Sequence, residues 1–114
     1  MTLKKLHHNR HLFSVLSSSK PRLRKVILNN IDREFIKLIS ELCLNLTAGN
    51  VQLPDAIKKQ TRQHQSIFSA LSKRKTSQKQ KRKHLVQAGE GFFTVLLPII
   101  AGLVSNLLLS PSQS

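Results

Sequence analysis

Charge is sorted into blocks along this chain, and the sorting limits which parts can be buried together. Residues 1–30 carry seven Lys or Arg and no acid, and residues 57–90 carry ten Lys or Arg and one acid. Residues 31–56 carry two cations and four acids, whereas residues 91–114 have no charged side chain. A generic solvated surface mixes its signs, so this segregation indicates function as well as fold.

The excess of cations predicts a polyanionic partner. Nineteen Lys and Arg face five Asp and Glu among 114 residues, which gives a formal net charge of +14. Self-repulsion at that charge works against a compact monomer, and a polyanion relieves it. We therefore expect nucleic acid as the first partner and an anionic membrane as the second. The apolar fraction of 39% still indicates that part of the chain folds.

Apolar periodicity predicts an all-α fold. The clearest helix has an apolar stripe at three- and four-residue steps, formed by Ile27, Ile31, Phe35, Leu38, Ile39, Leu42 and Leu46. Gly49-Asn50 predicts its end. A second helix is expected to begin at Pro54-Asp55, and a third to cover Gln78–Gln87 with Thr76 or Ser77 as its cap.

The domain organisation follows from these elements. Residues 1–22, with Ser17-Ser18-Ser19 and little periodicity, are expected to be a disordered basic arm. The other expected parts are a basic helical domain at 23–88, a glycine hinge at 89–91, an apolar helix at 92–110 and a disordered tail at 111–114. The predicted fold is thus a small bundle of two or three helices with a flexible basic N-terminal arm and a hinged apolar C-terminal helix.

The basic segments predict binding to phosphates rather than to base edges. The run at 73–83 places seven cations in eleven residues. Each neutralised phosphate releases condensed counterions, which gives sequence-independent affinity. The predicted nucleic-acid-binding residues are the cations Arg22, Arg24, Lys25, Lys58, Lys59, Arg62, Lys73, Arg74, Lys75, Lys79, Lys81, Arg82 and Lys83.

The uncharged segment after residue 91 leaves several interpretations open. Eighteen residues in a helix span about 27 Å, slightly short of the bilayer core. The segment could complete a helical core, support self-association through residues 92–109, lie on a membrane, or cross it. The residues expected to pack against helices or a membrane are Phe92, Phe93, Leu96, Leu97, Ile100, Leu103, Val104 and Leu107.

No sequence motif indicates catalysis. The chain contains neither a phosphate-binding G-x-x-x-x-G-K-[ST] loop nor a G-x-S-x-G elbow, and we predict a protein that is not an enzyme and needs no cofactor. His7, His8 and His11 are not expected to hold a metal, and His64 is expected to pack on an apolar face. Cys43, the single cysteine, is interpreted as a small buried hydrophobe of a reducing compartment, and the N-terminus predicts no signal peptide.

Two segments resemble known proteins. The segment at 35–51, FIKLISELCLNLTAGNV, is followed by Lys58-Lys59, the Lys-rich run and the segment HLVQ at 84–87. Together they resemble small basic proteins encoded by Maverick/Polinton elements and adintovirus-like genomes. The segment at 89–102, GEGFFTVLLPIIAG, resembles the apolar tail of the core protein X precursors of adenoviruses. The resemblance spans roughly residues 31–105 and implies a virion core protein that condenses double-stranded DNA in the particle and the host nucleus.

The sequence therefore predicts a non-enzymatic protein that binds and condenses nucleic acid without regard to sequence. The alternative is a membrane-active protein, or one that bridges genome and capsid, acting through the apolar C-terminal helix.

Overall fold

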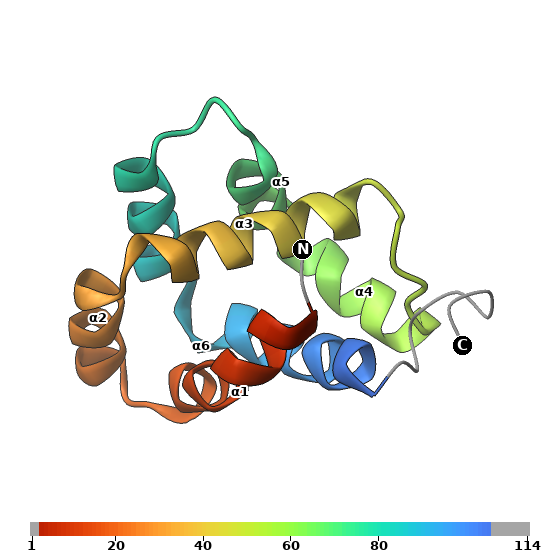
Figure 1. Ribbon diagram of the computed structural model, residues 1–114, viewed down its shortest axis with the longest axis horizontal. Helices are drawn as coiled ribbons and strands as arrows, with labels where there is room; N and C mark the ends of the chain where they lie inside the picture. The colour runs from red at the N-terminus through yellow and green to blue at the C-terminus, as the bar shows by residue number, and fades with distance from the viewer. Residues whose placement is uncertain (1–2, 106–114) are drawn as a thin grey trace.

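The structure, a computed structural model, describes residues 3–105 as six helices and contains no strand in that range (Figure 1). The helices are α1 Leu3–Ser18, α2 Pro21–Asn30, α3 Arg33–Thr47, α4 Asp55–Gln63, α5 Gln65–Ser72 and α6 Gln78–Val104. The all-α prediction is confirmed. The prediction of two or three helices is wrong, because the chain is divided into more and shorter helices than the periodicity indicated.

Polar residues divide the predicted helices. The stripe from Ile27 to Leu46 is split between α2 and α3, because the Asp32 side chain accepts a hydrogen bond of 2.8 Å from the backbone N–H of Phe35 and so begins a new helix. From the predicted start at Pro54-Asp55 the chain forms two short helices, α4 and α5, with His64 between them. The predicted third helix begins where expected, with the backbone N–H of Gln80 donating to Ser77 Oγ at 3.2 Å.

A glycine bends α6 into two segments. Gly89, within the predicted hinge, has φ of 78° and ψ of 178°, outside helical geometry. Positive φ is easily reached only by glycine, so the chain can turn here without strain. We call residues 78–88 the basic segment of α6 and residues 90–104 its apolar segment. Figure 1 shows the two segments running in different directions.

The structure corrects the expectation of a flexible basic arm. Residues 3–18 form α1, whose buried side chains are Leu6, Phe13 and Leu16, and α2 follows from Pro21. These three positions share one face at a helical repeat, although the histidines and cations between them obscure the pattern in the sequence. α1 packs along α6 and has its most extensive helix contact there. Met1 and Thr2 lie outside the described residues.

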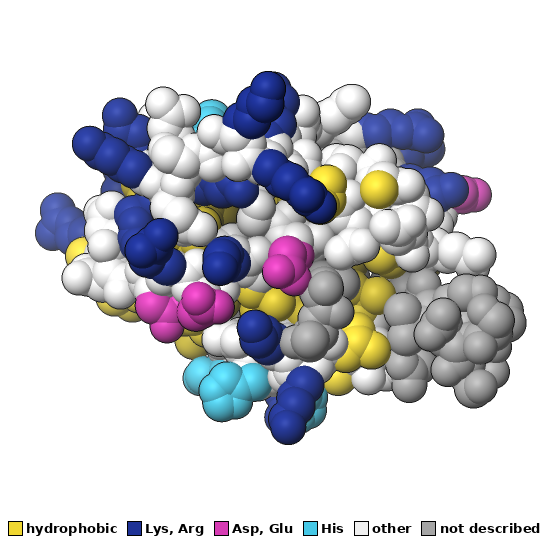
Figure 2. All heavy atoms as spheres, turned by 45° about the horizontal axis from the view of Figure 1, so that its top comes forward, with side chains coloured by type: hydrophobic (Ala, Val, Ile, Leu, Met, Phe, Trp, Pro, Cys, Tyr) yellow, Lys and Arg dark blue, Asp and Glu magenta, His cyan; other side chains and the backbone are white. Residues whose placement is uncertain are grey.

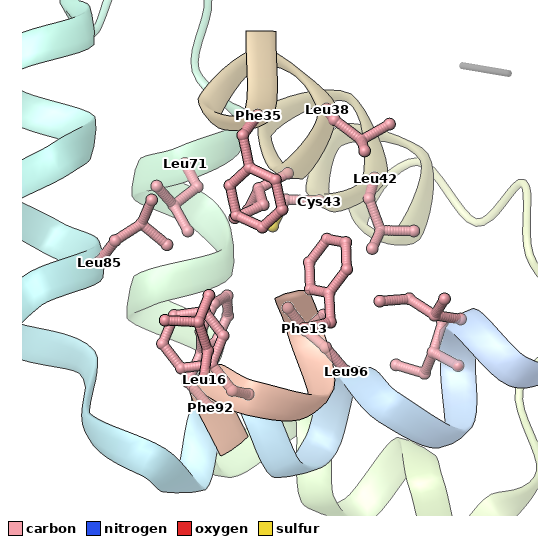
Figure 3. Close-up of a cluster of buried hydrophobic side chains, with 14 of the residues drawn as sticks. Phe13, Leu16, Phe35, Leu38, Leu42, Cys43, Leu71, Leu85, Phe92 and Leu96 are labelled. Atoms are coloured by element: carbon pink, nitrogen blue, oxygen red, sulfur yellow. The ribbon is translucent and has the colours of Figure 1, made fainter. Parts of the chain in front are cut away.

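The core draws on five of the six helices, and α4 contributes only half-buried side chains to it. Phe13 of α1 and Phe35 of α3 have ring centroids 4.9 Å apart, and Phe68 of α5 and Phe92 of α6 have centroids 5.2 Å apart. Figure 3 shows Phe13, Phe35 and Phe92 pointing into the space between their helices. Each of the five Phe side chains is buried. Half-buried His64 lies against Phe92, with ring centroids 6.4 Å apart.

The apolar segment of α6 is part of this core rather than a separate hinged helix. Its buried residues are Phe92, Phe93, Val95, Leu96, Ile99, Ile100, Gly102 and Leu103. Leu97 and Val104 are half-buried and line a cavity with residues of α1. By length and composition alone, α6 could cross a membrane. Leu107, the rest of the predicted helix to 110, and the predicted tail at 111–114 lie outside the described residues.

Candidate nucleic-acid interface

Three of the thirteen predicted nucleic-acid-binding cations are turned inward. Arg24 is 6% exposed and Lys81 7% exposed, while Arg82 is half-buried. Each of them reaches a backbone carbonyl at the C-terminal end of a helix, directly or through one hydroxyl. A helix C-terminus carries the negative end of the helix dipole and carbonyls without helical partners, so it is a natural site for a cation.

Two of these contacts are direct. Arg24 Nη1 donates to the carbonyl oxygen of Ser19, the residue after α1, at 3.0 Å. Arg82 Nη1 donates to the carbonyl oxygen of Leu28, in the last turn of α2, at 2.6 Å. The second contact joins α2 to the basic segment of α6.

Lys81 reaches its helix end through a serine. Its Nζ donates to Ser40 Oγ at 2.6 Å, and that hydroxyl donates to the carbonyl oxygen of Leu71, near the end of α5, at 2.7 Å. Burial lowers the pKa of the Lys81 ammonium group. Burial also raises the pKa of the nearby Cys43 thiol well above its usual range, so Cys43 is a neutral core residue. Lys81 therefore ties α6 to α3 and α5.

The remaining cations form the outer surface. The ten other members of the predicted set are exposed, namely Arg22, Lys25, Lys58, Lys59, Arg62, Lys73, Arg74, Lys75, Lys79 and Lys83. Six cations outside that set are also exposed, namely Lys4, Lys5, Arg10, Lys20, Arg33 and Lys37. Lys4, Lys5, Arg10 and Lys20 belong to the basic N-terminal block, whereas Arg33 and Lys37 lie in the block with four acids and gave no signal. On the face shown in Figure 2, Lys and Arg cover more of the surface than Asp and Glu.

A basic groove lies between α2 and the basic segment of α6. It encloses about 260 Å³ and is lined by Asn29, Lys79, Arg82, Lys83, Val86 and Gln87. None of these lining residues is acidic. Arg22 and Lys25 are exposed on α2, and Arg22 lies two helical turns before Asn29 on the same side of the helix. We call the cavity and its lining residues the α2–α6 groove.

A second group of exposed cations lies on α4, away from the α2–α6 groove. Figure 1 shows α4 at one end of the long axis, and α2 with the basic segment of α6 at the other. The described molecule extends 40 Å along that axis. Lys58, Lys59 and Arg62 therefore form a separate cationic patch, the α4 surface, which the fold does not join to the α2–α6 groove.

The loop between α5 and α6 carries Lys73, Arg74 and Lys75, all exposed. Arg74 lines a second cavity of about 540 Å³ together with Lys37, Lys81 and Glu41. This cavity mixes both signs of charge, unlike the α2–α6 groove. Within residues 3–105, no group of three or more His, Cys, Asp or Glu side chains is placed to hold a metal ion.

Comparison with known proteins gives no match to a family model, a curated protein or a solved structure.

Proposed function

We propose that this protein is a non-enzymatic, sequence-independent nucleic-acid-binding protein that condenses its polymer. The observation that carries the proposal is the division of the cations. Those that the fold uses are satisfied by helix ends, and sixteen others are exposed beside only five acids. Exposed cations without matching carboxylates are available to phosphates, which they attract at long range and neutralise on contact.

The α2–α6 groove supports a backbone-directed mode of binding. Its exposed cations, Lys79 and Lys83, are long and flexible, and lysine contacts phosphate as a point charge. Such contacts fix a protein on its polymer without reading sequence. Arginine and lysine can also contact guanine edges, but Arg82 Nη1 already donates to the Leu28 carbonyl. The groove adds only the amides Asn29 and Gln87 for base contacts.

The α4 surface supports condensation rather than simple coating. A condensing protein must hold two polymer segments at once, and the 40 Å molecule presents one cationic region at each end. The α2–α6 groove and the α4 surface can therefore contact different segments. The resemblance of residues 31–105 to virus-like core proteins suggests double-stranded DNA as the polymer, with the virion and the host nucleus as the locations.

Membrane insertion by the apolar segment of α6, the alternative function, carries a structural cost. Phe92, Phe93 and Leu96 are fully buried, so insertion would separate α6 from α1 and open the core. Leakage from vesicles of anionic lipid, at protein concentrations that leave duplex DNA unbound, would favour this alternative.

The test of the proposed function is binding of the full-length chain to a 30-base-pair duplex of random sequence across a salt series. The full chain is required because Phe92 to Leu103 complete the core. Contact with roughly eight phosphates predicts a slope of log affinity against log salt near −7. Affinity that does not change with salt would contradict the proposal.

Matched variants separate binding from condensation. Lys79→Gln/Lys83→Gln is expected to reduce the magnitude of the salt slope by about 2, since each lost phosphate contact removes about 0.9. Lys58→Gln/Lys59→Gln removes the same charge from the other end. This variant is expected to bind a short duplex more tightly than Lys79→Gln/Lys83→Gln does. It is also expected to raise several-fold the protein concentration at which light scattering detects compaction of long DNA. Equal effects of both variants in both assays would argue against two separate surfaces.

A further inference from the structure

The face of α2 that points away from the protein combines exposed apolar side chains with cations. Among residues 3–105, the large hydrophobic side chains left exposed are Leu23 at 53% and Val26 at 54%. They lie three residues apart, so they are neighbours on the helix surface. Arg22 and Lys25 are exposed beside them. An exposed apolar pair therefore lies within a basic helix face.

The position of α2 makes this face accessible. α2 packs on α6 and has no comparable contact with another described helix. Its buried side chains, Arg24 and Leu28, face the protein and leave the opposite side open. Figure 1 shows α2 at the extreme end of the molecule.

The helix is also firmly anchored at both ends. Arg24 Nη1 donates to the carbonyl oxygen of Ser19 before the helix, and Arg82 Nη1 donates to the carbonyl oxygen of Leu28 in its last turn. Pro21 is at the first helical position, where its fixed φ favours helix. A helix fixed at both ends keeps its exposed side chains in place when they contact a partner.

We propose that Leu23 and Val26 form an apolar wedge that enters between base pairs of duplex DNA and bends it, while the α2–α6 groove holds the adjacent phosphates. This inference rests on the proposed function and adds a mechanism to it. Architectural proteins that bind the minor groove insert apolar side chains at a base step, unstack it and kink the duplex by about 20–90°. Duplex DNA is the occupant that matches the charge here, because Arg22 and Lys25 flank the pair and Lys79 and Lys83 line the adjacent groove.

Bending fits the physical problem of condensation. Duplex DNA has a persistence length of about 150 base pairs and resists tight curvature. Neutralising phosphates brings segments together but leaves this stiffness largely in place. A wedge supplies local kinks, and pyrimidine–purine steps such as TA, which are easily unstacked, are the expected sites.

The experiment compares binding with bending. A 30-base-pair duplex with one central TA step carries a fluorescence donor and acceptor at its ends, and the full-length protein is added in low salt. Wild-type protein is expected to raise energy transfer at saturation. Leu23→Ala/Val26→Ala is expected to bind with affinity reduced by less than tenfold and to leave energy transfer at the level of free DNA. Alanine is favourable in a helix and both sites are exposed, so the variant should fold, which circular dichroism checks.

The charge variant Lys58→Gln/Lys59→Gln, on the α4 surface and outside both the wedge and the α2–α6 groove, provides the matched control. It is expected to bend the short duplex at saturation as wild type does. A second variant, Leu23→Met, keeps an apolar side chain of similar volume at the wedge and should retain bending.

The outcomes distinguish this inference from the proposed function. Wild-type protein that binds the duplex without changing energy transfer overturns the wedge and leaves the proposed function standing, whereas failure to bind duplex at all overturns both. Bending by Leu23→Ala/Val26→Ala equal to wild type also overturns the wedge. Two further results overturn the wedge. In one, these substitutions leave DNA bending intact and abolish self-association measured by sedimentation. In the other, they leave DNA bending intact and abolish binding to anionic vesicles.

Discussion

The two segments of α6 are consecutive in the chain, yet they bury side chains in different ways. The apolar segment places Phe92, Leu96 and Ile99 in the core with no exposed surface. The basic segment buries Leu85 together with Lys81, whose ammonium group is satisfied through Ser40. The apolar segment is stabilised mainly by apolar burial, whereas the basic segment combines a smaller apolar contribution with polar contacts at helix ends. The comparison shows that a basic sequence block can be part structural and part available for binding.

The largest expected effect is in the apolar segment. Phe92→Ala should lower the free energy of unfolding by about 3–5 kcal/mol, because it removes a buried ring that contacts Phe68 and Phe93 and leaves a cavity. Chemical denaturation followed by circular dichroism measures this. Thr94→Ala, at an exposed position of the same segment, is the control. A Phe92→Ala protein as stable as wild type would contradict the assignment of this segment to the core.

A smaller effect is expected at the polar contact of the basic segment. Ser40→Ala should cost about 1–3 kcal/mol, since it leaves the Lys81 ammonium group and the Leu71 carbonyl without their shared partner. Lys81→Met keeps an apolar chain of similar length and removes the charge, so it should be much closer to wild type. If Lys81→Met were more destabilising than Ser40→Ala, the charge of Lys81 would contribute more to stability than its hydrogen bond to Ser40.

Alkaline pH should narrow the stability difference between wild type and Cys43→Ala. Burial raises the pKa of Cys43 in the folded protein, so above about pH 8.5 the unfolded thiol loses its proton while the folded one keeps it. The unfolded state then binds fewer protons, and wild-type stability falls by up to about 1.4 kcal/mol per pH unit. Lys81 acts in the opposite direction, because its pKa is lowered on folding, but it is present in both proteins.

Denaturation of both proteins at pH 8 and pH 10 checks this prediction. The gap between them should be smaller at pH 10. A gap that stays constant would mean that the Cys43 thiol reaches solvent in the folded protein.

The smallest effects on stability are expected at two neighbouring residues of the α2–α6 groove, Arg82 and Lys83. Arg82→Gln should cost about 1 kcal/mol of stability, because its contact with the Leu28 carbonyl is only half-buried. Lys83→Gln should leave the unfolding free energy unchanged and reduce the magnitude of the DNA salt slope by about 0.9. Thermal melting and salt-dependent binding measure the two quantities. If Lys83→Gln lowered the stability and Arg82→Gln reduced the salt slope instead, Lys83 would have the structural role and Arg82 the binding role.

Much of the local structure could be predicted from the sequence. The all-α class, the Ser77 cap and a break within 89–91 each depend on local residue chemistry, and the structure has all three. The N-terminal helix could not be foreseen in the same way. Leu6, Phe13 and Leu16 are spread through a polar stretch, and they form a face only because α6 supplies a surface to pack on.

The candidate interface was predictable as charge but not as geometry. Counting cations identified the basic blocks, yet it could not separate Lys81, Arg82 and Arg24 from the exposed neighbours on either side. That separation depends on which helix ends come close in the folded chain, a long-range property. The grouping of Arg22 and Lys25 with Lys79 and Lys83 likewise required the packing of α2 on α6.

The helix-end contacts of Arg24, Lys81 and Arg82 also affect how the fold responds to acid. Proteins commonly unfold at low pH because carboxylates that hold cations in the native state take up protons. A backbone carbonyl and a serine hydroxyl do not titrate in that range. The three internal anchors of this molecule should therefore persist in acidic surroundings that would release ordinary salt bridges.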